Sequence, residues 1–111
     1  MKAIEHFNWL KSVIGDCGFV SDQFPEHECT KQNEREKDVF DGENEYLCII
    51  ADIRFPREFR MSVMKPYVYK EEKRTYFGWV GVDSDEVLSF WKNPIHELDD
   101  EFVVAWKALN K

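Results

Sequence analysis

The sequence predicts an α+β fold, in which an antiparallel sheet of three or four strands packs against an N-terminal helix and two C-terminal helices. Residues 46–53, 59–69 and 74–82 form apolar, aromatic-rich runs separated by turns, the pattern of a meander. Residues 2–14 carry apolar side chains at helical spacing, and two C-terminal segments begin with acidic residues that favour a helix N-terminus. With 111 residues, the chain is expected to be one α+β domain over 1–111.

The first helix is predicted over residues 2–14. Ile4, Phe7, Leu10 and Ile14 recur on one side of such a helix. Gly15 follows at the position where a left-handed residue commonly ends a helix. We therefore expect the apolar stripe of this helix to pack on the sheet.

Residues 21–45 differ abruptly in composition, because Phe24, Val39 and Phe40 are nearly their only large apolar residues. Pro25 suits the first position of a helix that would run to about residue 37. A structureless loop of this length is unusual in a compact domain. The segment is therefore predicted to be a marginal helix or a functional loop, closed by a turn at residues 41–44.

The three meander strands differ in how they alternate. Residues 46–53 are largely apolar on both faces, which favours a central strand that is covered on at least one side. Residues 59–64 alternate between apolar and polar side chains. Pro66 predicts an edge position or a break, because proline cannot donate a hydrogen bond to a sheet.

Two further helices are expected at the C-terminal end. Asp83 and Glu86 have the spacing of a capping box for a helix over residues 83–91. A second helix over residues 96–109 is predicted from an apolar stripe at helical spacing, made by Leu98, Phe102, Ala105, Trp106 and Leu109.

The motifs of common active sites and metal sites are missing from the sequence. His27, Glu28 and Cys29 are adjacent, but neighbouring residues do not face one site, and no pair of cysteines or histidines has zinc-ligand spacing. We therefore predict no catalytic residues, no metal and no cofactor. Three cysteines cannot form a closed disulfide framework, and no apolar run reaches the roughly 20 residues of a membrane span, so the expected location is the cytoplasm.

Charge is distributed unevenly along the chain. The net charge of −7 includes −6 from residues 21–45, whereas residues 46–82 carry +3. We call the acidic residues of this segment the acidic belt, and take as its candidate binding residues Glu26, Glu28, Glu34, Glu36, Asp38, Asp41, Glu43 and Glu45. Aromatic side chains beside the belt are candidate contacts for a partner, because aromatic residues dominate binding energy at many interfaces: Phe24, Phe40, Phe55 and Tyr69.

The leading hypothesis is a small acidic protein that binds and neutralises a basic partner protein, in the manner of an immunity protein, an antitoxin or a phage counter-defence inhibitor. The partner would be a nuclease or a nucleic-acid-binding complex, with no direct contact between this chain and nucleic acid or a membrane. A belt that serves only to keep the protein soluble is the simpler alternative.

Two other functions are open to a chain of this composition. The first is a small ligand-binding or catalytic domain with a pocket lined by Tyr76, Trp79 and Trp106. The second is nucleic-acid binding on the sheet, which requires exposed Tyr67, Tyr69 or Phe77 beside Arg60 and Arg74. Residues 74–80 partly resemble the aromatic strand of RNA-recognition sheets, but Thr75 replaces the glycine of that pattern and Phe77 is an additional residue.

Overall fold

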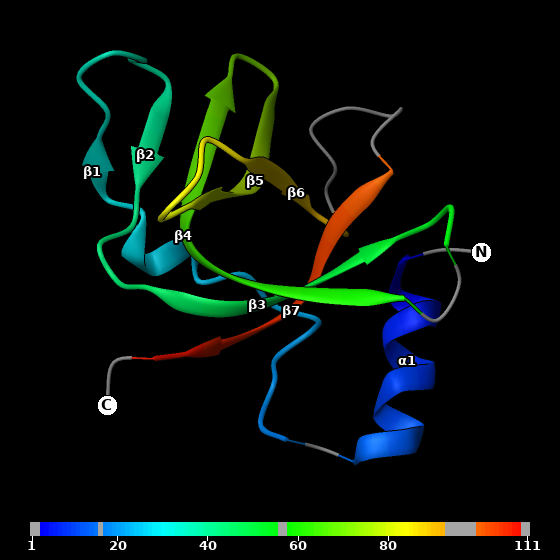
Figure 1. Cartoon of the computed structure of the whole chain (residues 1–111). Coiled ribbons are helices and arrows are strands. Elements are labelled where there is room, and N and C mark those ends of the chain that lie inside the picture. Colours follow the sequence, from blue (N-terminus) through cyan, green and yellow to red (C-terminus); the bar gives the residue numbers. More distant parts are fainter. Residues whose placement is uncertain (1–2, 16, 56–57, 93–99, 110–111) are drawn as a thin grey trace.

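In the part of the chain that the structure describes, the protein is a β-barrel with one α-helix outside it and a short sheet extension on one side (Figure 1). The computed structural model describes residues 3–15, 17–55, 58–92 and 100–109. In chain order the elements are α1 (Ala3–Ile14), the 3₁₀ turn η1 (Glu26–Glu28), β1 (Lys31–Gln32), β2 (Val39–Asp41), β3 (Tyr46–Asp52), β4 (Phe59–Glu71), β5 (Arg74–Gly81), β6 (Val87–Phe90) and β7 (Glu101–Ala108).

The barrel is made by β3 to β7, each paired with the next strand in the sequence, and it closes where β7 pairs with β3. All of these pairings are antiparallel except that of β6 with β7, which is parallel. The predicted α+β fold, an open antiparallel sheet with three helices, is therefore wrong. The meander itself is confirmed, since β3, β4 and β5 lie within or close to the three predicted strands.

The barrel interior is filled by side chains. A barrel of five strands is narrower than the eight-stranded barrels that can just enclose a small ligand. Its core consists of Tyr46, Cys48, Ile50, Met64, Trp79, Leu88 and Val103. Tyr46 packs edge-on against both Trp79 and Trp106, with ring centres 5.6 and 5.1 Å apart. Trp79 and Trp106, which were expected to line a ligand pocket, thus pack in and against the core instead.

The helix α1 covers the outer face of β3 and β7, which confirms the helix predicted over residues 2–14. Phe7 is 2% exposed and packs with Ile49, Ala51, Val104 and Ala105 in a second apolar cluster. Because β3 lies between this cluster and the barrel core, both of its faces are buried. That explains why its sequence is apolar at nearly every position.

Both predicted C-terminal helices are absent from the described residues. The segment that was expected to form the last helix contains β7, while residues 96–99 lie outside the described ranges. In the β3–β7 ladder, Ile49 pairs with Ala105 and Ile50 with Val103, so Val104 is an extra residue. Because of this bulge, the inward-facing residues Val103 and Trp106 are three positions apart in the sequence. That is the spacing expected for apolar residues on one face of a helix.

The other predicted C-terminal helix, over residues 83–91, is replaced by a turn and the short strand β6. The backbone N–H of Gly81 donates to the carbonyl of Glu86 (2.8 Å), which closes the connection between β5 and β6. Glu86 therefore belongs to a turn and not to a capping box. A strand of four residues is too short to display a clear period of its own.

Residues 21–45 form neither a long helix nor a structureless loop. A bridge between Val20 and Trp106 leads into the segment, and the indole N–H of Trp106 donates to the carbonyl of Gln23 (2.7 Å). After η1 the chain forms the β1–β2 hairpin. Asn33 shapes its loop, because its side-chain oxygen accepts from the backbone N–H groups of Arg35 (2.8 Å) and Glu36 (3.2 Å).

Pro66 lies at the break that the sequence predicts. Strand β3 pairs with β4 only as far as Met64, and β2 pairs with β4 from Tyr67 onward, both on the same edge. Between them, the backbone N–H of Gly42 donates to the carbonyl of Pro66 (2.9 Å). On this edge of β4, neither β2 nor β3 pairs with residue 66. The backbone N–H that proline lacks is therefore not needed for a hydrogen bond of the sheet.

Candidate partner-binding surface

The sheet continues beyond the barrel as a four-stranded extension, which we call the arm. It consists of β1, β2, residues 67–71 of β4 and residues 74–77 of β5. Strand β6 pairs with β5 only at residues 78–80, so these parts of β4 and β5 extend past the closed barrel. The arm and α1 lie on opposite sides of the molecule (Figure 1).

Directly opposed residues of an antiparallel pair share a face, so the register sorts the side chains of the arm. The inner face, continuous with the barrel interior, carries Phe40, Val68 and Phe77. The outer face carries Val39, Tyr69 and Tyr76 in one row across β2, β4 and β5.

The inner face is covered by the chain that precedes β1. The ring centre of Phe24 lies 4.9 Å from that of Phe77, 5.2 Å from that of Trp79 and 5.7 Å from that of Phe90. Phe24 therefore closes this end of the barrel. It was predicted as a contact for a partner, but its place in the structure is that of a packing residue.

The outer face presents two tyrosines surrounded by carboxylates. The rings of Tyr69 and Tyr76 lie 6.0 Å apart and are both half-buried. The pKa of the Tyr69 phenol is raised, first by the charge of Glu71, then by desolvation and a hydrogen bond to Glu71, and further by Asp38 and Glu36. Three carboxylates therefore lie close enough to Tyr69 for their negative charge to disfavour the phenolate.

Several basic groups lie within or beside this acidic group. Lys31, Arg35 and Lys37 are exposed on the same hairpin, and the guanidinium of Arg74 lies 5.1 Å from the ring centre of Tyr76. The surface therefore has positively and negatively charged side chains around the two tyrosine rings. Such a pattern selects a partner by the placement of its charges, in addition to their sum.

The eight candidate acids of the belt do not form one continuous group. Five are exposed, namely Glu26, Glu34, Glu36, Asp38 and Glu43, and three are half-buried, namely Glu28, Asp41 and Glu45. Glu36 and Asp38 belong to the group around Tyr69. Burial, together with the charges of Glu28, Asp41 and Glu26, raises the pKa of Cys29 from 9.0 to about 12, which places these three acids around that thiol.

The remaining predicted aromatic contacts have different surroundings. Phe40 is half-buried on the inner face, with the ammonium of Lys70 4.7 Å from its ring centre. Phe55 is 49% exposed, but it precedes β4, whereas Tyr69 lies near the other end of that strand. Of the four predicted aromatic residues, Tyr69 alone therefore lies within the acidic group of the outer face.

Two members of this surface, Glu71 and Tyr76, were missing from the predicted binding site. They flank the two-residue turn of the β4–β5 hairpin, where Glu71 pairs with Arg74 and Tyr69 with Tyr76. Reading residues 72 and 73 as the turn would have placed Tyr69 and Tyr76 opposite each other. No sequence signal would have brought Glu36 and Asp38 to the same place, because that depends on β2 pairing with β4.

The surface that nucleic-acid binding would require is assembled only in part, because Tyr69 is half-buried on the arm near Tyr76 and Arg74. Tyr67 is 8% exposed, and Phe77 lies on the opposite face of the arm from Tyr69. Arg60 forms ion pairs with Glu86 and Glu101, whose carboxylates occupy its guanidinium. Opposite charges at contact distance leave little cationic field for phosphates.

Metal sites and membrane-spanning helices are both missing from the described ranges. In those ranges, no group of three or more His, Cys, Asp and Glu side chains is arranged to hold a metal ion. No helix in them has the length and apolar character needed to cross a membrane.

Comparison of the chain with protein-family models, with curated proteins and with solved structures found no match.

Proposed function

We propose that this protein binds a basic partner protein through the outer face of its arm. The observation that carries the proposal is the arrangement around Tyr69. Glu71 lies two residues away on the same face of β4, and the backbone N–H of Lys70 donates to the carbonyl of Asp38 (2.8 Å), which places the loop of Glu36 and Asp38 beside Tyr69. The ring of Tyr76 lies 6.0 Å from that of Tyr69. Glu36 and Asp38 lie in the loop of the β1–β2 hairpin, whereas Glu71 is the last residue of β4. Aromatic rings that are partly exposed and bordered by charge are the typical centre of a protein interface.

The charge balance of the rest of the molecule supports this location. Arg54 and Arg60 are paired with Asp52, Asp100, Glu86 and Glu101 on the barrel. Among the residues that the structure describes, no ion pair includes Glu36 or Asp38. Carboxylates that are already exposed and unpaired lose no internal partner when a lysine or arginine of another protein approaches.

Blocking the activity of the partner is the expected consequence of binding and stays a prediction. The test begins with capture of partners on the full-length protein from lysate of its own cells, identified by mass spectrometry. Captured proteins are then compared on three forms: the wild type, the charge reversal Glu36→Lys with Asp38→Lys, and a control reversal, Asp83→Lys with Asp85→Lys. The control residues are exposed on the β5–β6 connection, and both pairs change the net charge equally.

A basic protein retained by the wild type and the control, and lost from the Glu36/Asp38 reversal, is the expected result. Its association rate should fall roughly tenfold on reversal, with a weaker dependence on salt, because complementary charge accelerates encounter. Equal retention on both reversed forms would place the interface elsewhere. Absence of any stoichiometric partner would contradict the proposal as a whole.

A further inference from the structure

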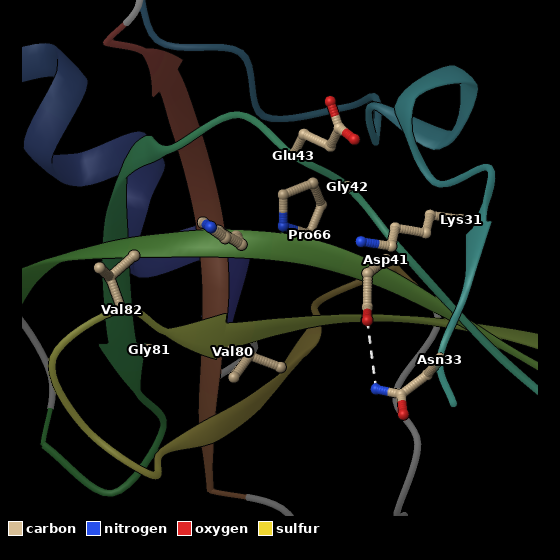
Figure 2. A pocket seen from close by; sticks show the side chains of 10 residues that line it. Lys31, Asn33, Asp41, Gly42, Glu43, Pro66, Val80, Gly81 and Val82 are labelled. Carbon is tan, nitrogen blue, oxygen red and sulfur yellow. Dashed lines mark hydrogen bonds between the residues drawn. The ribbon is translucent and has the colours of Figure 1, made fainter. Parts of the chain in front are cut away.

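A pocket opens on the outer face of the sheet at the base of the arm, separate from the tyrosine pair (Figure 2). It has a volume of about 450 Å³, within the range of small-molecule sites. Lys31 of β1, Lys65 of β4 and the acids Asp41 and Glu43 contribute its charges. In Figure 2 the side chains of Lys31, Asp41 and Asn33 lie on one side of the pocket and that of Val82 on the other.

The charges of the pocket do not neutralise one another by direct contact. Lys31 and Asp41 are opposed in the β1–β2 ladder, yet the Asp41 carboxylate accepts a hydrogen bond from the side-chain amide of Asn33 (3.1 Å). Among the described residues, Lys31, Lys65, Asp41 and Glu43 form no ion pair. Two ammonium groups and two carboxylates thus line one cavity. The Asp41 carboxylate is held by Asn33, whereas the Glu43 side chain points in the opposite direction, beyond Pro66 (Figure 2).

The rest of the lining is apolar and held in place by the backbone. Val80 is half-buried, Val82 is 36% exposed, and Pro66 is buried. A Cβ atom on Gly42 would lie 2.8 Å from the Cγ atom of Pro66, so only glycine lets this wall approach β4 so closely. The pocket therefore combines a preformed apolar wall with charges of both signs.

We propose that this pocket binds a small zwitterion, namely an amino acid or dipeptide with an apolar side chain. The ligand carboxylate would contact the lysines, and its ammonium would contact Glu43, because the carboxylate of Asp41 is already held by Asn33. The ligand side chain would lie on Val80 and Val82. A simple anion would gain from the lysines but be repelled by Asp41 and Glu43, and a simple cation would meet the reverse. A ligand with both charges gains from the lysines and from the acids and avoids both repulsions.

The test is a titration of the full-length protein with the dipeptide Leu-Leu, followed by calorimetry and by the backbone NMR signals. The expected dissociation constant is on the order of 1 mM, with shifts concentrated at Gly42, Val80 and Val82. N-acetylated Leu-Leu, which lacks the ammonium, and Leu-Leu amide, which lacks the carboxylate, should each bind at least about fivefold more weakly. Free leucine in the same titration shows whether a single amino acid is sufficient.

Variants test the assignment of the charges. Lys65→Met and Glu43→Gln, both at exposed positions, should each weaken binding about fivefold, whereas Lys73→Met in the β4–β5 turn should leave it unchanged. The proposal is overturned if neither Leu-Leu nor leucine shifts the pocket signals at about 10 mM. Equal binding of the blocked and free dipeptides would overturn it as well. The titration involves only this protein and the dipeptide, and no partner protein. A negative result would therefore overturn the pocket proposal without bearing on partner binding by the arm.

Discussion

The contact between Gly78 and Tyr67 allows a sharp test of the arm. Gly78 lies opposite Tyr67 in the β4–β5 ladder, and a Cβ atom on Gly78 would come within 2.5 Å of the tyrosine ring. The ring cannot move aside easily, since Tyr67 is only 8% exposed. Overpacking of this kind lowers the free energy of unfolding by about 1–3 kcal/mol. Replacing a glycine in a strand raises it by about 0.5–1 kcal/mol.

We therefore expect Gly78→Ala to lower the free energy of unfolding by about 1–2 kcal/mol, and the melting temperature by about 4–8 °C for each kcal/mol in a chain of about this size. Urea unfolding followed by far-ultraviolet circular dichroism measures the change. If the clash is the cause, Gly78→Ala in a Tyr67→Ala background should be neutral or stabilising, which a double-mutant cycle shows as coupling.

The matched control is Gly15→Ala at the end of α1. Gly15 has a φ of +80°, and no atom lies within 4 Å of the position that a Cβ would occupy, so its substitution costs only backbone strain, about 1 kcal/mol. That cost should be the same with or without Tyr67. A Gly78→Ala variant that is as stable as the wild type would refute the packing argument, and so would a loss that persists when Tyr67 is alanine.

Three other predictions follow from the same contacts. Phe24→Ala should lower the free energy of unfolding, measured in urea, by about 2–4 kcal/mol, because it removes the side chain that closes one end of the barrel. Phe55→Ala should have almost no effect on stability. Equal effects of the two substitutions would contradict the packing role of Phe24. Arg60→Met should lower the free energy of unfolding by about 0.5–1 kcal/mol. Because Arg60 and its two glutamate partners are partly exposed, this difference from the wild type should become smaller in about 1 M salt. A loss of stability that does not depend on salt would indicate that Arg60 acts through packing. Cys17 should react with a thiol reagent in the folded protein, whereas Cys29, with its pKa raised from 9.0 to about 12, should stay protected. The pKa of Cys29 is higher in the folded than in the unfolded chain, so its contribution to stability is complete below pH 9 and declines between pH 9 and 12; rapid labelling of Cys29 at about pH 8 would contradict this.

The parts of the fold that the sequence predicts correctly are those in which local pattern and tertiary environment agree. The stripe of α1 faces one surface, the three meander strands are long enough to show their apolar pattern, and Pro66 marks the break in pairing along β4. The C-terminal error has a different origin. In β7 both faces are buried and the bulge at Val104 shifts the alternation, so a strand acquires apolar residues at the spacing of a helix.

The candidate surface was predictable only in part. The exposure of Glu34, Glu36 and Asp38 follows from their composition, because a hairpin loop without apolar residues has nothing to bury. Their position beside Tyr69 does not, since it depends on the pairing of β2 with β4. Both strands of the β1–β2 hairpin are short, and the two residues of β1 are fully polar, which leaves no periodic signal to identify them.

The filled barrel has a consequence for where this protein can bind anything. Since Tyr46, Trp79 and their neighbours occupy the interior, recognition has to take place on the outside. On β4, alternate residues Lys65, Tyr67 and Tyr69 share the outer face, so the Tyr67 ring, packed on Gly78, lies between the pocket and the tyrosine pair. Displacing that ring with Gly78→Ala should therefore weaken dipeptide binding and partner capture together, even at temperatures where the variant is fully folded. A variant that loses stability but retains both kinds of binding would show that the two surfaces do not depend on this contact.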